Sequence, residues 1–137
     1  MPFVVDASFA AGWFLPTQAN ETATRLIRRL DTDNAVVPDL FRHELRNLLL
    51  SAFRRQKLDR AMLFEQTARA ERFPFEDAGP GEAVFILRLA LEHGLTAYDA
   101  AYLALALTRR LELATNDAAL VKAGRKEGIG VVTRGDT

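Results

Sequence analysis

The stretch TAYDAAYLALALTRRLELATND, residues 96–117, decides the fold of this chain. Thr96 is a favourable helix N-cap residue, and the segment from Tyr98 to Arg109 is almost entirely apolar, which predicts a buried central helix. Leu111–Ala114 is a short, mainly apolar run, as in a strand that is covered on both faces. A central helix followed by a covered strand is typical of α/β proteins with a parallel sheet.

The same alternation of strand and helix extends outward to both ends of the chain. Further strands are predicted at residues 3–5, 35–37 and 131–132. Helical spacing of apolar residues predicts helices at residues 9–14, 20–30, 40–53, 60–72, 84–93 and 117–126. We expect Ser8 to cap the first of these helices. The sequence therefore predicts a single three-layer α/β domain over residues 1–137, with a short parallel β-sheet of about four to five strands flanked by helices.

The composition excludes several classes of protein. Hydrophobic residues make up 49% of the 137 residues, enough to bury a core. The absence of Cys excludes a disulfide scaffold, a thiolate zinc site and a cysteine nucleophile. The apolar N-terminal run has no basic residue and is interrupted by Asp6, unlike a signal peptide, and the apolar run at residues 100–107 is too short to span a membrane. We therefore expect a soluble, cytoplasmic protein without a membrane partner.

The net charge is zero, but the charges are unevenly distributed. Residues 25–72 carry eleven Lys or Arg against seven Asp or Glu. This basic excess is either a solvated helical surface or a rim that receives phosphates.

Four of the eighteen acidic residues occupy positions that call for an explanation. Asp6 and Asp117 come at the carboxyl ends of predicted strands, and Glu44 and Asp99 lie near the starts of predicted helices. The carboxyl ends of parallel strands and the first turns of the helices that follow them share one edge of a sheet. We therefore expect the four side chains to lie close together, although 38, 55 and 18 residues separate them in sequence.

Each of these acids also has a purely structural interpretation. Asp6 and Asp117 could be helix N-caps, Asp99 could interact with a helix dipole, and Glu44 could be an ordinary exposed helix charge. This interpretation is weakest for Asp6 and Asp99, because both lie inside apolar segments, where a charge is seldom buried without a partner.

Taken together, the four acids predict a metal site. Several carboxylates in one crevice repel one another, and no Lys or Arg lies in the segments around Asp6 and Asp99. A hard divalent cation would neutralise them. Oxygen ligands without Cys or His favour Mg²⁺ or Mn²⁺ over Zn²⁺.

The chain resembles PIN-domain ribonucleases, specifically the VapC-type toxins of VapBC toxin–antitoxin modules. The matching pieces occur in the family's order: VVDAS at 4–8, HELRNLL at 43–49, TAYDAAYLALA at 96–106 and LATND at 113–117. The resemblance implies a PIN-like fold and an Mg²⁺-dependent endoribonuclease, the toxin of a type II toxin–antitoxin system, which cleaves RNA by metal-activated water.

The resemblance also implies roles for individual residues. It assigns catalysis and metal binding to four acids: Asp6, Glu44, Asp99 and Asp117. We expect Asp6 and Asp99 to bind the metal directly, and three polar residues to support the site: Ser8, Asn47 and Thr115. Some members carry another carboxylate two residues beyond the last acid, where this chain has Ala119, so a second metal ion lacks one ligand.

The expected partners follow from the same resemblance. They are an RNA substrate, a cognate antitoxin that covers the active site, and a second copy of the chain in a homodimer, within a larger toxin–antitoxin assembly. Arg42 and Arg46 are candidates for gripping RNA phosphates. The apolar residues of helices 60–72 and 81–93 are either part of an interface or simply core.

Three alternative functions are considered. A catalytically silent PIN-like RNA-binding or regulatory protein would keep the fold without the reaction. A phospho-receiver signalling domain would need a phosphoacceptor Asp at the end of a middle strand and a Lys after the last strand, where this chain has Pro38 and Thr133-Arg134. A haloacid-dehalogenase-like hydrolase would need a second Asp where Ser8 stands.

Overall fold

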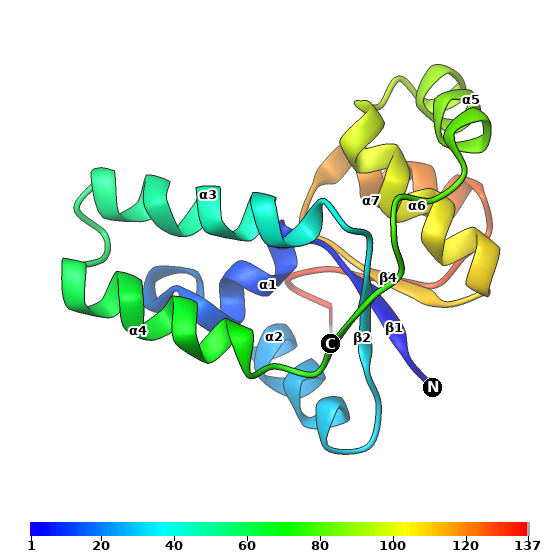
Figure 1. Ribbon diagram of the computed structural model, residues 1–137. Coiled ribbons are helices and arrows are strands. Elements are labelled where there is room, and N and C mark those ends of the chain that lie inside the picture. Colours follow the sequence, from blue (N-terminus) through cyan, green and yellow to red (C-terminus); the bar gives the residue numbers. More distant parts are fainter. Residues whose placement is uncertain (137) are drawn as a thin grey trace.

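The computed structural model describes residues 1–136, and a parallel sheet of five strands forms its centre (Figure 1). The strand order is β3-β2-β1-β4-β5, and every neighbouring pair is parallel. The strands are β1 (Phe3–Val5), β2 (Ala35–Val37), β3 (Phe75–Asp77), β4 (Glu112–Ala114) and β5 (Val131–Val132). Because β1 is central and all its residues are buried, the acid that follows it lies in the middle of one sheet edge.

The helices form two layers, one on each side of the sheet (Figure 1). The first layer comprises α1 (Ala7–Phe14), α2 (Glu21–Ile27), α3 (Phe41–Arg54) and α4 (Arg60–Glu71), with 3₁₀ turns η1 (Pro16–Gln18) and η2 (Arg28–Asp31). The second layer comprises α5 (Ala83–His93), α6 (Ala97–Arg109) and α7 (Ala118–Lys126). In the second layer α6 lies centrally, packed against β1, β4 and both neighbouring helices. These observations confirm the predicted three-layer α/β fold and the central position of the apolar helix.

Aromatic side chains hold the first helical layer to the sheet. Trp13 of α1 is only 6% exposed and contacts five phenylalanine rings within 6.5 Å: Phe3, Phe9, Phe14, Phe73 and Phe75. Its indole Nε1 donates a hydrogen bond to the carbonyl of Ala23 at 2.8 Å, so the one polar atom of the side chain is satisfied inside the core. Trp13 therefore links α1 to α2 and, through Phe3 and Phe75, to the strands β1 and β3 of the sheet.

The structure differs from the local predictions at two places. Ser8 does not cap the first helix: Asp6 is the N-cap of α1, and the Ser8 hydroxyl donates to the same carboxylate. The strand β3 was not predicted, because it has only three residues, two of them acidic, and lies half-exposed at the edge of the sheet. The predicted cap at Thr96 is confirmed, Asn20 caps α2, and α5 ends at Gly94, which has a φ of 65°.

Among residues 1–136, no helix combines the length and the apolar character needed to cross a membrane.

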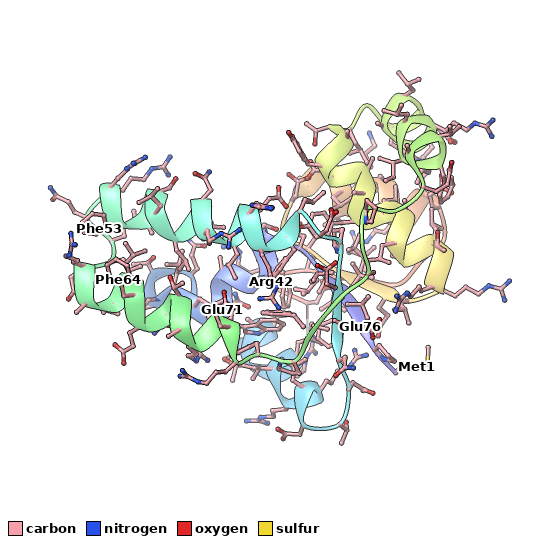
Figure 2. The ribbon with its side chains drawn as sticks, viewed as in Figure 1. Met1, Arg42, Phe53, Phe64, Glu71 and Glu76 are labelled. Atoms are coloured by element: carbon pink, nitrogen blue, oxygen red, sulfur yellow. The ribbon has the colours of Figure 1, made fainter. Side chains whose placement is uncertain are left out.

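Replacing Trp13 with Ala should lower the free energy of unfolding by about 3–5 kcal/mol, because it leaves a large cavity among the aromatic rings and removes the bond to Ala23. Urea unfolding followed by far-UV circular dichroism measures the change. Phe64→Ala is the matched control, because Phe64 on α4 is 61% exposed (Figure 2) and should cost less than about 1 kcal/mol. Equal losses in the two variants would contradict this account of the core.

Candidate active site

Four carboxylates line one cavity at the carboxyl edge of the sheet. The cavity has a volume of about 280 Å³ and is bordered by Asp6, Ala7, Ser8, Glu44, Asn47, Leu48, Asp99, Tyr102 and Asp117. The structure thus brings together the four acids that the sequence singled out, and Ser8 and Asn47 beside them. Among the described residues 1–136, no Lys, Arg or His lines this cavity, so four acidic groups face it without a cationic side chain. We call it the acid cavity.

Asp6 is the most buried of the four acids, with 4% of its surface exposed. Its Oδ1 accepts hydrogen bonds from the backbone N–H of Phe9 at 2.9 Å and from the Ser8 hydroxyl at 2.7 Å, and its Oδ2 accepts one from the Thr115 hydroxyl. Burial nevertheless raises the pKa of Asp6 to about 6, because loss of solvent outweighs the three hydrogen bonds. The nearby Asp99 carboxylate raises this pKa further.

Glu44 enters the acid cavity from the first turns of α3. Its Oε1 accepts a hydrogen bond of 2.5 Å from the Tyr102 hydroxyl of α6. Burial raises the pKa of Glu44, the bond from Tyr102 opposes that rise, and the charge of Asp99 adds to it.

Tyr102 is a site residue that the sequence analysis missed. It lies inside an apolar helix, where nothing in the sequence sets it apart from core residues, and its side chain is indeed buried. Its position three residues after Asp99 was the available signal, because residues i and i+3 share one face of a helix. Burial, the bond to Glu44 and the surrounding carboxylates all raise the pKa of Tyr102, so its hydroxyl stays protonated and acts as a donor.

Asp99 and Asp117 complete the acid cavity from α6 and α7. Asp99 lies in the first turn of α6, where its own backbone N–H donates to Thr96. The pKa of Asp99 is raised by burial and then by the charge of Asp117. Asp117 is the N-cap of α7 and accepts a hydrogen bond from the N–H of Leu120 at 2.8 Å. The structural and functional interpretations of Asp6 and Asp117 are therefore compatible: each caps a helix and faces the acid cavity.

Two hydroxyls and one amide fix the geometry of this edge. Thr115 is fully buried, donates to Asp6 and accepts from the backbone N–H of Asp117 at 3.1 Å. Ser8 donates to Asp6 and accepts from the backbone N–H of Asn116 at 3.0 Å. The side chain of Asn116, a second residue that the sequence analysis missed, accepts from the backbone N–H of Arg134 at 2.7 Å. These bonds join the ends of β1, β4 and β5.

The donor set fits a hard divalent cation. All the polar side-chain groups around the acid cavity offer oxygen, apart from the amide nitrogen of Asn47. The charge of Asp99 raises the pKa of Asp6 and of Glu44, and the charge of Asp117 raises the pKa of Asp99, as expected for like charges that lie close together. No three of the four carboxylates place oxygens within 4.8 Å of one another, as expected when only like charges face each other. A cation would draw these oxygens inward.

A second cluster, at the far end of α5, has a structural explanation. His93 Nε2 lies 2.6 Å from Glu127 Oε2, and Glu92 is adjacent. The bond joins the last residue of α5 to the C-cap residue of α7, so it holds two helix ends together.

Neither of the predicted phosphate-binding arginines lines the acid cavity. Arg42 lies 3.8 Å from Glu71 and above the ring of Phe75, between α3 and α4 (Figure 2). Arg46 is exposed, with Nη2 at 2.9 Å from Nδ1 of His43. Their contact with RNA stays a prediction, as do the catalytic and metal-binding roles of the acids.

The sequence profile of the PIN domain matches residues 3–126. This chain belongs to the PIN-domain family. The PIN domain is 31% identical over 115 residues to Ribonuclease VapC3 of Pyrobaculum aerophilum, covering 77% of this chain and 82% of that protein. The family assignment confirms the predicted resemblance and argues against the phospho-receiver and the dehalogenase-like alternatives.

Solved structures support the fold of this PIN domain. PAE2754 from Pyrobaculum aerophilum matches with a TM-score of 0.73 and 24% identity, over 97% of this chain and 83% of that one. FitAcB from Neisseria gonorrhoeae matches with a TM-score of 0.68 and 19% identity, over 96% of each chain. VapBC2 from Rickettsia felis, bound to a DNA fragment from their promoter, matches with a TM-score of 0.69 and 10% identity, over 98% and 99% of the two chains.

Asp6→Asn should stabilise the metal-free PIN domain at neutral pH. A pKa raised from 3.8 to about 6 means that the folded state binds the Asp6 proton more tightly than the unfolded state. The stability contributed by this proton is fully present below about pH 4 and is lost as the pH rises through about 6. The variant should therefore match the wild type near pH 4 and exceed it by up to about 3 kcal/mol at pH 7.5.

Urea unfolding in EDTA between pH 4 and 8 measures this difference. Asp31→Asn, at an exposed position, is the control and should show a difference that does not vary with pH. A constant difference for Asp6→Asn as well would contradict the burial of a charged carboxylate at this edge.

Proposed function

We propose that this PIN domain is a divalent-metal-dependent endoribonuclease that uses Mg²⁺ or Mn²⁺ and serves as the toxin of a type II toxin–antitoxin pair. The observation that carries the proposal is the acid cavity, in which four carboxylates face one volume of about 280 Å³ without a cationic side chain. A group of this kind suits a divalent cation bound together with a phosphodiester. The similarity to Ribonuclease VapC3 supports RNA as the substrate.

In the proposed mechanism, a bound divalent cation supplies charge for the scissile phosphate and lowers the pKa of a water molecule. Asp6 and Asp99 would hold the cation, because three hydrogen bonds fix Asp6 and because the charge of Asp99 lies close enough to raise the pKa of Asp6. Glu44 would accept the proton of the attacking water, since burial raises its pKa toward the working range of a general base. Asp117, which lines the same cavity, would bind a second cation or act through a water molecule.

Tyr102 and Thr115 are positioning residues in this mechanism. The Tyr102 hydroxyl donates to one oxygen of Glu44 and leaves the other oxygen to accept a proton. Thr115 donates to Asp6 and accepts from the backbone of Asp117, so one hydroxyl sets the separation of two acids. A catalytically silent relative would have no need to retain all four acids in this arrangement.

Asp6→Asn and Asp99→Asn should each lower Mg²⁺-dependent cleavage of single-stranded RNA by more than about 100-fold, because each removes a charge that binds the cation, and even outer-shell changes cost 10–100-fold. Gel analysis of end-labelled RNA with Mg²⁺, Mn²⁺ or EDTA measures the loss, and circular dichroism checks the fold. Glu65→Gln, at an exposed acid on α4 far from the site, should cleave like the wild type. Wild-type rates for both aspartate variants would end the proposal.

We propose two protein partners, a cognate antitoxin and a second copy of the chain. The similarity in fold to the FitAcB and VapBC2 structures supports a two-component assembly. On α5, Val84, Leu87 and Leu91 form an exposed apolar stripe, and Leu91 is 86% exposed. Ile86 and Leu89 of the same helix are buried in the core, which is one of the two interpretations that the sequence left open for these apolar residues. A cytoplasmic location stays a prediction.

Leu87→Glu combined with Leu91→Glu should convert a dimer into a monomer, because two charges would be buried without partners at the interface. Light scattering after size-exclusion chromatography measures the mass, with Phe64→Glu on α4 as the control on another exposed apolar residue. A dimer that persists in the double variant would place the contact elsewhere on the PIN domain.

A further inference from the structure

A second and larger cavity opens beside the acid cavity and shares Ser8 and Leu48 with it. Its volume is about 570 Å³, and it lies between α1, η1 and the second half of α3. Three charged residues line it, and all three are basic: Arg55, Lys57 and Arg134. We call it the basic cavity. Two adjoining cavities of opposite charge therefore lie on one face of α3.

The helical spacing of α3 makes the two cavities continuous. Glu44, Leu48, Ser51 and Arg55 follow one another at intervals of four, three and four residues, so they share one face of the helix. Glu44 and Arg55 are eleven residues apart, or about 16 Å along the helix axis. The face of α3 therefore changes from acidic to basic over a length that exceeds a single nucleotide.

The three cations are available to an external anion. Among residues 1–136, the ion pairs with nitrogen–oxygen distances up to 4.0 Å do not involve Arg55, Lys57 or Arg134, and all three side chains are exposed. Arg55 and Lys57 follow the end of α3, near Phe53 in Figure 2, where cations complement the helix dipole. The dipole of α3 does not explain the position of Arg134, which lines the same cavity from the segment that follows β5.

Arg134 is tied to the acid cavity by a chain of hydrogen bonds. Its backbone N–H donates to the Asn116 side chain at 2.7 Å, the backbone N–H of Asn116 donates to Ser8 at 3.0 Å, and Ser8 donates to Asp6 at 2.7 Å. The segment that carries Arg134 is thus fixed relative to the buried carboxylate. Its guanidinium extends from this fixed backbone toward Gln18, whose Oε1 lies 3.5 Å from Nη1.

We propose that the basic cavity holds the phosphates of an unpaired RNA strand on one side of the cleaved bond, with Arg55, Lys57 and Arg134 as positioning residues. This inference rests on the proposed nuclease function. No aromatic side chain lines the cavity, whose other polar groups are hydroxyls and amides from Thr17, Gln18, Ser51 and Asn116. Contact therefore runs through phosphate and ribose rather than through stacked bases, and binding on this side is tolerant of sequence.

The sign pattern favours RNA over a protein segment. An acidic peptide that followed the three cations would carry its own carboxylates toward the four acids next door, where like charges repel. An RNA strand is negatively charged along its whole length. It would nevertheless suit both cavities, because a divalent cation bound in the acid cavity would present positive charge to the phosphate there.

The test compares a variant with three changes, Arg55→Ala, Lys57→Ala and Arg134→Ala, with a control that loses three exposed arginines elsewhere: Arg25, Arg28 and Arg72. For a single-stranded RNA oligonucleotide, the basic-cavity variant should raise KM at least about 10-fold and leave kcat within about two-fold, since uniform binding is lost without a change in the transition state. Hydrolysis of bis(4-nitrophenyl) phosphate, which has no neighbouring phosphate for the basic cavity to bind, should be unchanged. The control should match the wild type in both assays.

Fluorescence anisotropy in EDTA measures RNA binding separately from cleavage. With about 0.7 counterions released per phosphate contact on a single strand, removing three contacts should lower the slope of log Kd against log salt by about 2. An unchanged KM and an unchanged slope would overturn the proposal. Loss of antitoxin binding in pull-down with unchanged RNA affinity would also overturn it and assign the basic cavity to the protein partner.

The nuclease proposal and this inference can fail separately. If the wild type cleaves neither substrate with Mg²⁺ or Mn²⁺, the proposed function fails, while a salt-dependent loss of RNA binding in the basic-cavity variant would still support the cavity assignment. If the wild type cleaves RNA and both triple variants behave alike, the nuclease stands and the basic cavity has no role in RNA binding.

Discussion

The structure depends on a carboxylate held almost out of water at the end of the central strand. Asp6 caps α1, accepts a hydroxyl bond from Thr115 beyond β4, and accepts another from Ser8. The same group therefore starts a helix, joins two neighbouring strand ends and presents charge to the acid cavity. Burial works against that charge and raises the pKa of Asp6 to about 6, so the fold holds this group at a cost that a cation can offset.

The other acids show how a fold can bring like charges together without losing its shape. Asp117 is secured by its capping bond to α7, and Glu44 by the hydroxyl of Tyr102. The carboxylates of Asp6, Glu44 and Asp117 are thus each held by a local bond that does not depend on the cation. A site organised in this way keeps its outline in the metal-free state, which is the condition for rapid binding of a cation and a phosphate.

The sequence predicted those features that follow from local chemistry and from the topology of parallel sheets. The apolar helix at 97–109, the short buried strands and the convergence of the four acids all followed from the rule that strand ends share one edge. The edge strand β3 escaped prediction because three half-exposed residues carry almost no pattern. The role of Tyr102 was not predicted, because a tyrosine inside an apolar helix is equally typical of the core. Ser8 was wrongly predicted as the helix cap, because the neighbouring Asp6 carboxylate accepts the capping hydrogen bond from Phe9.

The basic cavity lay beyond the sequence for a different reason. The excess of positive charge in residues 25–72 was visible, but charge counts do not say which side chains share a surface. Arg42 belongs to that basic segment but lies beside Glu71. Arg134 lies outside the segment, yet it lines the same cavity as Arg55. Only the hydrogen bonds from Arg134 through Asn116 and Ser8 to Asp6 place the cation beside the acids. One small hydroxyl, that of Ser8, borders both cavities, so the strand ends fix the backbone positions from which Asp6 and Arg134 extend. In the proposed function, the same few bonds at the edge of the sheet would therefore position both the metal ion and the RNA strand.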